Sequence, residues 1–409
     1  MGFEIRTITE ADIEQYLDVL GIAFGADRND GEADRLRQVL GLDRASAVFD
    51  RGRIVATMGS YRLDVVVPGG ADVAAAGLTR VTVAATHRRQ GLLTAMIDAH
   101  LSEAEADRRP ISVLWASEAP IYGRFGYGSA SENVAIDIDA GTAGIVAPRE
   151  RDELSIVSAE EAAPVLADVY DRARTRRPGF LKRNDAWWEQ RILSDRDHDR
   201  EGNSSLRRVV ARRDGDPVGY VLYRQKPQWD DHDLPQGTNH LVELVALDHR
   251  AEHNLWWYLS SIDLFPNVKI WTEPSDTILP RIARNERAVV RRTNDGVHVR
   301  IVDVATALEA RRYDAAGNLA IAVTGPSAGD AGAGTFRLTV DDDGWATCRP
   351  TEDEADVSIS VTGLGSLYLG AGSIPGLLLR GELTGAPDHV DQLRRCFAWP
   401  VAPWCNDLF

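Results

Sequence analysis

The sequence predicts an α/β protein of three domains, each with mixed strands and helices. Its 409 residues are more than one ordinary hydrophobic core organises. Residues 1–140 place antiparallel strand patterns ahead of a strand–helix–strand crossover. The C-terminal part returns to short strands with alternating apolar residues. We therefore expect domains at 1–145, 146–300 and 301–409.

The elements of the first domain are apolar segments separated by turn residues such as Pro68-Gly69-Gly70. We expect strands at Phe3–Thr7, Ala45–Asp50, Ile54–Val67, Val73–Ala84, Ile111–Ala116 and Asn133–Ile138. Helices are expected at Glu10–Phe24, Ala33–Leu40, Gly91–Ala106 and, as a short helix, Ala119–Phe125. The strand at Asn133–Ile138 is expected to close the sheet of this domain.

A linker is expected at 140–151, where the composition shifts to Gly, Ala, Pro and Thr. In the third domain we expect strands at Leu319–Val323, Thr335–Val340, Ala346–Arg349 and Val357–Val361. An apolar segment at Leu364–Gly370 and an amphipathic helix at His389–Phe397 follow. This order predicts a sheet with helices packed on one face.

A basic turn joins an apolar strand to an apolar helix in the segment Val81-Thr82-Val83-Ala84-Ala85-Thr86-His87-Arg88-Arg89-Gln90-Gly91-Leu92-Leu93. A helix start leaves main-chain amides unpaired and carries about half a positive charge, so it attracts phosphate oxygens. Gly91 lets the backbone approach a ligand closely, and two arginines add positive charge. The segment predicts a pyrophosphate site, although a helix that merely begins with two arginines is the simpler alternative. It matches neither a Walker loop nor Gly-x-Gly-x-x-Gly.

The segment Val242–His253 echoes this turn but has lost its chemistry. If the two segments correspond, Glu252 stands where the first has Gln90, and His253 stands where it has Gly91. A carboxylate repels phosphate and a side chain blocks close approach, so we interpret the segment as a duplicated unit that does not bind the pyrophosphate. Chance similarity over so short a segment is the alternative.

The composition limits the class of partner. The net charge of −16 argues against nucleic acid and favours cationic ligands, unless the acidity serves only solubility. We see no apolar run of the roughly 18 residues that a membrane helix needs, and Met1–Arg6 does not resemble a secretory signal. Cys348, Cys396 and Cys405 show no metal-site spacing. We expect a cytoplasmic protein with reduced thiols, no metal, no nucleic-acid partner and no membrane partner.

Five separated blocks resemble those of the enhanced intracellular survival (Eis-like) aminoglycoside N-acetyltransferases of the GNAT superfamily. They are Thr86–Leu93, Ala116–Glu118, Ile121–Gly128, Ala307–Arg311 and Leu364–Gly370, and together they cover essentially the whole chain. The first is similar to the R/Q-x-x-G-x-G/A acyl-CoA turn of the superfamily, with Leu93 standing where Gly or Ala is usual.

This resemblance implies two tandem GNAT-like domains, a C-terminal domain like that of sterol carrier proteins, and a homohexamer. It also implies acetylation of aminoglycoside antibiotics at several amines, with protein lysine and polyamines as other acceptors and acetyl-CoA as cosubstrate. The residues expected to bind acetyl-CoA are Val81, Val83, Arg88, Arg89, Gln90, Gly91, Leu92, Leu93, Thr94 and Ser117.

Tyr122 is the candidate general acid. In a GNAT fold the strands at Val81–Ala84 and Ile111–Ala116 splay apart around the thioester, and Tyr122 then falls beside the leaving sulfur. A tyrosine with an ordinary pKa of about 10 can protonate a thiolate whose conjugate acid has a pKa of about 8.5. A core aromatic role is the alternative for Tyr122, and it is the role that we expect for Tyr127.

The resemblance assigns the general base to the C-terminal carboxylate, here that of Phe409. The tail from Trp399 to Phe409 holds two prolines and several aromatics, which favours a rigid, docked segment. Phe24, Asp27 and Asp407 are candidate substrate-binding residues, because they offer an aromatic wall and carboxylates to a cationic amine. A lipid or sterol-binding protein with the GNAT units as scaffold is the rival interpretation.

Overall fold

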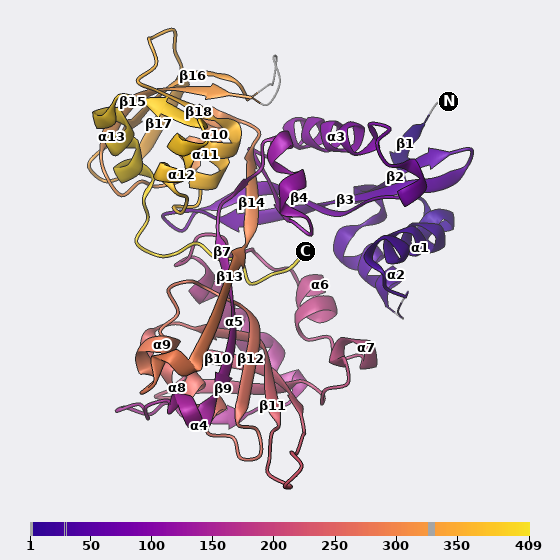
Figure 1. Cartoon of the computed structure of the whole chain (residues 1–409), viewed down its shortest axis with the longest axis vertical. Helices are drawn as coiled ribbons and strands as arrows, with labels where there is room; N and C mark the ends of the chain where they lie inside the picture. The colour runs from indigo at the N-terminus through magenta and orange to yellow at the C-terminus, as the bar shows by residue number, and fades with distance from the viewer. Residues whose placement is uncertain (1–2, 28, 30, 326–331) are drawn as a thin grey trace. The chain divides into compact units, whose positions relative to one another are not determined.

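The structure is a computed structural model of the chain and describes residues 3–27, 29, 31–325 and 332–409. The backbone divides into two compact units. The first unit comprises Met1–Ser131, Pro178–Lys182 and Asp295–Phe409, and the second comprises Glu132–Arg177 and Arg183–Asn294. Figure 1 labels the elements of both units.

The first unit contains a seven-stranded sheet in the order β1-β2-β3-β4-β5-β14-β6. Its strands are β1 (Glu4–Thr7), β2 (Ala45–Asp50), β3 (Arg53–Val66), β4 (Asp72–Val83), β5 (Ile111–Trp115), β14 (Val297–Ile301) and β6 (Gly128–Ser129). β3 pairs antiparallel with β2 and β4, whereas β4 pairs parallel with β5. The helix α3 (Leu92–Ala106) makes this crossover, as the sequence predicts.

Helices of the first unit bury their apolar sides against this sheet. The helix α1 (Ile13–Phe24) follows the 3-10 turn η1 (Glu10–Asp12) and ends where Gly25 takes a left-handed φ of 66°. The helix predicted at Ala33–Leu40 is present as α2 (Glu32–Arg35) and a π-helical turn, η2 (Leu36–Leu40). Short 3-10 turns complete the set: η3 (Leu42–Arg44), η4 (Ala85–His87), η5 (Ala119–Ile121) and η6 (Gly123–Phe125).

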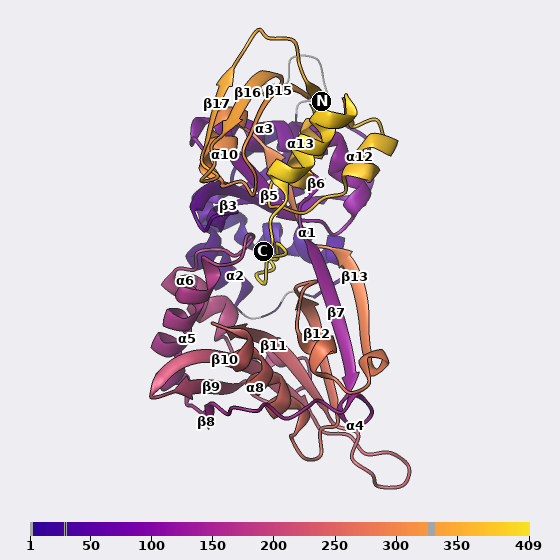
Figure 2. The same ribbon diagram turned by 90° about the vertical axis from the view of Figure 1, so that its left-hand side faces the viewer.

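The strand predicted to close the first sheet belongs to the other sheet. It forms β7 (Glu132–Asp139), which pairs antiparallel with β12 (Asn267–Glu273) in the second unit. Figure 2 shows β7 side by side with β12 and β13, between the two. Its place in the first sheet is taken by β14, whose five residues are all buried and which pairs antiparallel with β5. The alternating pattern identified a strand correctly, but the choice of partner depends on tertiary packing.

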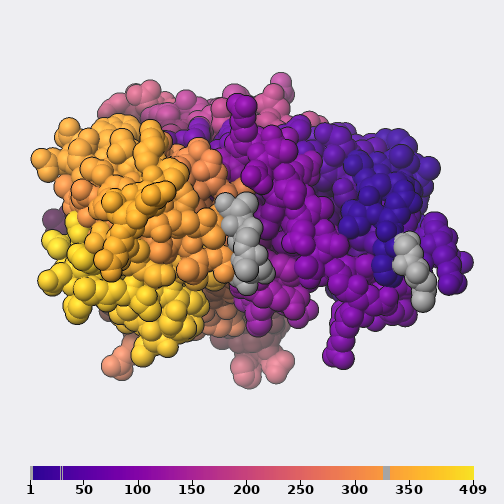
Figure 3. Space-filling view, turned by 90° about the horizontal axis from the view of Figure 1, so that it is seen from above, coloured from indigo at the N-terminus to yellow at the C-terminus, as the bar shows by residue number. Residues whose placement is uncertain are grey.

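The C-terminal part of the first unit is a five-stranded sheet in the order β17-β16-β15-β18-β19. The strands are β15 (Gly317–Thr324), β16 (Gly334–Val340), β17 (Ala346–Pro350), β18 (Val357–Ser360) and β19 (Leu383–Gly385). The helices are α10 (Val304–Ala310), α11 (Val361–Leu367), α12 (Ile374–Leu379) and α13 (Pro387–Phe397). In Figure 3 these residues, orange to yellow, gather into one mass.

Two glycines let α11 lie directly against strands of the first sheet. A Cβ added to Gly128 in β6 would lie 2.0 Å from the carbonyl oxygen of Thr362. A Cβ added to Gly365 would lie 2.2 Å from the carbonyl oxygen of Val299 in β14. Neither distance is possible for a real side chain, so this backbone contact requires glycine at both positions. Each glycine lies in one of the blocks that carry the family resemblance.

The second unit contains a seven-stranded sheet in the order β13-β7-β12-β11-β10-β9-β8. Its further strands are β8 (Glu153–Ile156), β9 (Arg207–Arg213), β10 (Asp216–Lys226), β11 (Thr238–Ala246) and β13 (Val289–Asp295). Its helical segments are α4 (Ala140–Ala143), α5 (Ala159–Arg174), α6 (Asp185–Trp187), η7 (Trp188–Ile192), α7 (Asp197–Arg200), α8 (His249–Ser260), α9 (Leu279–Ile282) and η8 (Glu286–Ala288).

The expected linker at 140–151 is packed rather than free. The Val146 carbonyl accepts a hydrogen bond from His253 Nε2 at 2.7 Å, and the Glu150 carbonyl accepts one from Asn254 Nδ2 at 3.1 Å. Small and polar residues here serve close packing against α8.

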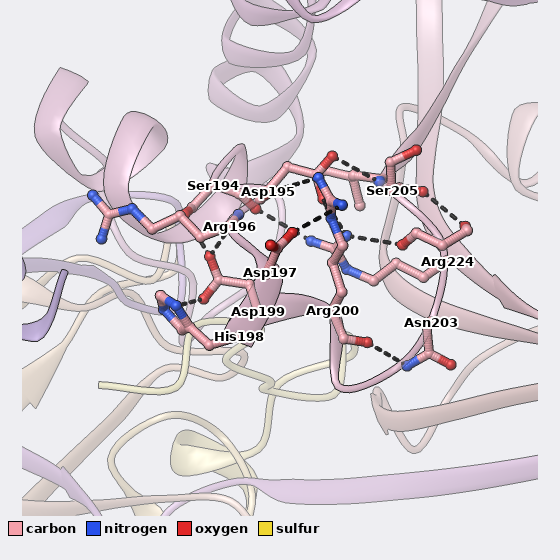
Figure 4. A network of polar contacts seen from close by, with 12 residues as sticks. Ser194, Asp195, Arg196, Asp197, His198, Asp199, Arg200, Asn203, Ser205 and Arg224 are labelled. Carbon is pink, nitrogen blue, oxygen red and sulfur yellow. Dashed lines mark hydrogen bonds and ion pairs between the residues drawn. The ribbon is translucent and has the colours of Figure 1, made fainter. Parts of the chain in front are cut away.

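A polar network shapes the connection between η7 and β9. Figure 4 shows Arg200 and Arg224 converging on Asp195, whose other oxygen accepts the Leu206 amide at 3.1 Å. Ser194 Oγ donates to Asp199 at 2.6 Å. These contacts tie the short helix α7 and the irregular segments on either side of it to one another. Across the described ranges of the chain, no helix combines the length and apolar character needed to cross a bilayer.

Candidate active site

A bulge in β4 opens the first sheet. Thr57 in β3 pairs with Thr82, and Gly59 pairs with Thr79, so Met58 alone faces Arg80 and Val81. Arg80 takes a left-handed φ of 53°. The Thr57 hydroxyl donates to the Arg80 carbonyl at 2.8 Å. The extra residue bends the end of β4 and increases its local twist.

Beyond the bulge, β4 has an open edge. Its parallel pairing with β5 runs from Ala75 opposite Ile111 to Leu78 opposite Leu114. β4 itself continues to Val83 and stays paired with β3 on its other side. The main-chain groups on the open side can therefore pair with an extended ligand, as another strand would.

The basic turn presents amides to the same opening. Arg89 and Gly91 take left-handed φ values of 62° and 80°. The first helical bond of α3 runs from the Ala95 amide to the Gly91 carbonyl at 3.0 Å. The amides that precede Ala95 are those that a helix start leaves for a ligand or water. Among the described residues, no atom beyond the adjoining residues and the backbone of α3 lies within 4 Å of a Cβ placed on Gly91, so the turn faces open space.

A cavity of about 540 Å³ unites the turn and the open strand. Nine of the ten residues predicted to bind cofactor line it, and Gln90 is the exception; Tyr122 and Phe24 line it as well. Residues that sequence reasoning missed are Ala23, Thr82, His87, Glu118, Ile121 and Arg124. His87 lies inside the predicted turn and Arg124 inside the block around Tyr122, so extension of each motif by its neighbours would have found both.

Tyr122 is buried to 7% exposure and reaches the cavity from the junction of η5 and η6. Burial, and secondarily the Glu118 carboxylate, raises the pKa of its phenol. The phenol is therefore protonated at neutral pH and available as a proton donor. Its ring meets the edge of Tyr127, with ring centres 6.1 Å apart.

Tyr127 has a different role, because its hydroxyl is committed to a buried network. Ser112 Oγ lies 2.7 Å from the Tyr127 hydroxyl, 2.8 Å from His100 Nε2 and 2.9 Å from the Ala76 carbonyl. A carbonyl can only accept, so the single Ser112 proton goes to Ala76 and both other groups must donate. Burial lowers the pKa of His100 to about 3, which leaves a neutral ring with its proton on Nε2. Tyr127 therefore belongs to the core, as expected.

Comparisons with known proteins identify the domains of this chain. Residues 4–130 and 179–301 each match an acetyltransferase (GNAT) domain, and 304–406 match a sterol carrier protein domain. An uncharacterized N-acetyltransferase of Streptomyces avermitilis is 37% identical over 412 residues and 99% of both chains. N-acetyltransferase Eis of Mycobacterium tuberculosis is 35% identical over 320 residues, which cover 76% of this chain and 74% of Eis.

The crystal structure of Eis1 from Mycobacterium abscessus superposes with a TM-score of 0.83 at 28% identity, over 99% of this chain and all of that one. This chain belongs to the Eis-like N-acetyltransferases of the GNAT superfamily. The Eis-like chain is therefore an acetyltransferase with two GNAT domains and a C-terminal domain of the sterol carrier type.

The second GNAT domain of this Eis-like enzyme fills its own helix start. The Asp248 side chain accepts the Ala251 amide at 2.9 Å, where the first domain leaves amides open. Hydrogen bonds from Arg213 lower the pKa of Asp248 to about 2. Glu252 accepts the Ile278 amide at 3.3 Å. Two fixed carboxylates at the start of α8 disfavour a diphosphate there.

The C-terminal tail of the Eis-like chain ends beside the first sheet. Trp115 Nε1, at the end of β5, donates to the Asp407 carbonyl at 2.8 Å. The Phe409 ring meets Tyr61 of β3 edge-on, with centres 6.3 Å apart. Asp407 is buried to 2% exposure and does not line the cavity, and neither does the exposed Asp27. The substrate-binding roles of Asp27 and Asp407 stay predictions.

Proposed function

We propose that this enzyme acetylates amines of polycationic acceptors, aminoglycosides among them, by direct attack on acetyl-CoA in a ternary complex. One observation carries the proposal. A single cavity of about 540 Å³ combines the amides of the basic turn, the open edge of β4 and the Tyr122 phenol. A diphosphate, an extended pantetheine arm and a thioester need these three features in this order.

The turn and the strand would hold acetyl-CoA. Amides at the start of α3 bind the diphosphate, and Arg88 and Arg89 add charge beside it. The pantetheine amides pair with the main chain of Val81 and Val83, whose side chains are half-buried. Ser117 lines the cavity just beyond β5. Holding amine and thioester together supplies about 7–11 kcal/mol of the barrier reduction.

Two groups would move the protons. The Phe409 carboxylate takes a proton from the acceptor ammonium, and the freed nitrogen attacks the thioester carbon. As the carbon–sulfur bond breaks, Tyr122 donates its proton to the sulfur. Overall the nitrogen loses two protons: one is released to solvent, and one replaces the proton that Tyr122 gave. Such groups contribute about 10²–10⁴-fold to the rate.

The acceptor is proposed to be cationic for electrostatic reasons. The chain carries a net charge of −16, which raises the local concentration of cations. Phe24, exposed to 55%, offers an aromatic face at the cavity, and the exposed Glu118 also lines it. An aromatic face and a carboxylate both attract ammonium groups.

Mass spectrometry of the products tests this proposal. The enzyme is incubated with acetyl-CoA and a mixed panel of aminoglycosides, polyamines and lysine peptides, with Tyr122→Phe as the matched control. Aminoglycosides that gain more than one acetyl group, at a rate reduced in the control, support it. Acetylation of peptides or polyamines alone would assign the acceptor to that class instead. Transfer to no amine would overturn the proposal.

The resemblance to the Eis-like N-acetyltransferases also leads us to propose that the enzyme forms a homohexamer. Light scattering gives the mass directly, and a value of six times 44.9 kDa is expected. A monomer mass would contradict it.

A further inference from the structure

A five-residue segment, Pro178–Lys182, packs within the first unit although the chain on both sides belongs to the second. We call this segment the clamp. It pairs antiparallel alongside the end of β3: the Val66 amide donates to the Phe180 carbonyl at 2.8 Å, and the Gly179 amide donates to the Val66 carbonyl at 2.8 Å. The Lys182 amide donates to Asp64 at 2.9 Å. Three main-chain bonds therefore fix the clamp to the sheet.

The C-terminal tail docks on the clamp at Trp404. The Trp404 amide donates to the Pro178 carbonyl at 2.9 Å. The Trp404 ring, buried to 4% exposure, meets Phe180 edge-on with centres 5.5 Å apart. An edge-to-face pair of buried aromatic rings stabilises the folded protein by more than the burial of their apolar area alone.

Gly179 makes this close approach possible. It takes a left-handed φ of 98°, and a Cβ added to it would lie 2.7 Å from the Trp404 carbonyl oxygen and 2.9 Å from its carbon. Both are main-chain atoms, so no rotation of a side chain can relieve the contact. Any larger residue at this position must displace the tail.

The route from Trp404 to the chain end is only five residues long and is held by further contacts. The Asp407 carbonyl accepts hydrogen bonds from the Cys405 thiol at 3.3 Å and from Trp115 Nε1 at 2.8 Å. Phe409 then contacts Tyr61. The tail has no regular secondary structure, and Figures 1 and 2 show it curving away from α13 toward the chain end. Five residues span at most about 18 Å, so the position of Trp404 limits where the carboxylate can lie.

We propose that the clamp positions the C-terminal carboxylate, with Gly179 and Phe180 as its positioning residues. This inference rests on the proposed function, in which the Phe409 carboxylate is the general base. The clamp fixes Trp404, Trp404 fixes the reach of the last five residues, and that reach sets where the carboxylate accepts the ammonium proton. The clamp itself touches neither substrate.

The test compares Gly179→Ala with Gly215→Ala. Gly215 has a similar left-handed φ of 89°, but no atom lies within 4 Å of its added Cβ, so it controls for backbone strain alone. We expect Gly179→Ala to lower kcat at least tenfold while the Kd of acetyl-CoA, from calorimetry, stays within twofold. Gly215→Ala should keep kcat within twofold.

The pH profile separates positioning from a general loss of structure. Without a placed base, only amine that is already neutral in solution reacts, so log kcat of Gly179→Ala should rise with unit slope up to the acceptor pKa. The unaltered enzyme should level off at lower pH. A uniform loss at every pH would overturn the proposal. If Gly179→Ala does not fold by circular dichroism, Phe180→Leu, which removes only the ring contact, carries the same comparison.

A third variant distinguishes this proposal from the proposed base. Two residues added after Phe409 displace the carboxylate without altering the clamp. If this extension lowers kcat and Gly179→Ala does not, the clamp is wrong and the base stands. If the extension leaves kcat unchanged, the base assignment is wrong and the clamp has nothing to position.

Discussion

Gly91→Ala is the sharpest perturbation of the cofactor turn. Gly91 has a left-handed φ of 80° and open space where a Cβ would stand. The substitution therefore adds a methyl group to the cavity without a clash inside the protein. Its cost to folding is the strain of an L-residue in this conformation, about 1 kcal/mol. The expected cost to binding is separate, because the added methyl group would hold the proposed diphosphate away from the amides.

The expected loss of affinity follows from the bonds at stake. A hydrogen bond to a charged group contributes about 1.5–3 kcal/mol, and each 1.4 kcal/mol is about tenfold in Kd. Loss of one such bond should raise the Kd of acetyl-CoA about 10- to 100-fold. Titration calorimetry measures this Kd, and urea unfolding measures the strain.

Gly52→Ala is the matched control for Gly91→Ala. Gly52 has a φ of 78° and equally open surroundings, but it lies in the turn between β2 and β3. Both variants should lose the same stability, and only Gly91→Ala should lose affinity. Acetyl-CoA binding by Gly91→Ala as tight as that of the unaltered protein would refute the assignment of this turn.

Further predictions concern the acid, the buried network and the rival function. Tyr122→Phe should lower kcat, measured from the free thiol that the reaction releases, about 100-fold, and the Kd of acetyl-CoA should stay unchanged. Unchanged turnover would remove Tyr122 from the acid role. Ser112→Ala leaves the Tyr127 and His100 donors without an acceptor and should lower the free energy of unfolding by about 3 kcal/mol in urea; a loss below about 0.5 kcal/mol would contradict the network. The pKa of His100 in the folded protein, about 3, lies below its value in the unfolded chain. Below pH 6.5 the unfolded chain therefore binds a proton that the folded protein does not, and the free energy of unfolding decreases as the pH is lowered. The loss should reach about 2 kcal/mol between pH 6.5 and 5 and be absent in His100→Gln; parallel curves would show a different source. Acetyl-CoA should raise the melting temperature; stabilisation by a sterol or acyl ligand alone would favour the lipid-binding interpretation.

Local pattern is enough to predict most elements and the strand–turn–helix around Gly91; that this turn binds acetyl-CoA stays a prediction. The strand at Ala45–Asp50 and the end of α3 at Ala106 agree with the sequence prediction, because alternation and helical periodicity are local properties. The turn was recognisable because its glycine, arginines and flanking elements are contiguous. Nine of the ten residues predicted to bind cofactor, from the turn, from β4 and from just beyond the end of β5, line one cavity.

Features that depend on distant partners could not be predicted. The strand at Asn133–Ile138 pairs in the second sheet because its apolar side chains fill the core of that unit, and alternation alone names no partner. The bulge at Arg80 and Val81 depends on the register with β3. The clamp is only five residues long, and its role depends on the contact between Gly179 and Trp404, which lie far apart in the sequence. The charge of Asp407 makes it a candidate substrate residue, but its burial depends on the docked tail and is not visible in the sequence.

A crystal structure with bound coenzyme A tests the central claim most directly. The account predicts the diphosphate within hydrogen-bonding distance of the amides between Arg88 and Leu93. It predicts the pantetheine arm along Val81 to Val83, with the sulfur near the Tyr122 hydroxyl. Coenzyme A bound at the start of α8, or absent from the cavity at saturating concentration, would contradict it.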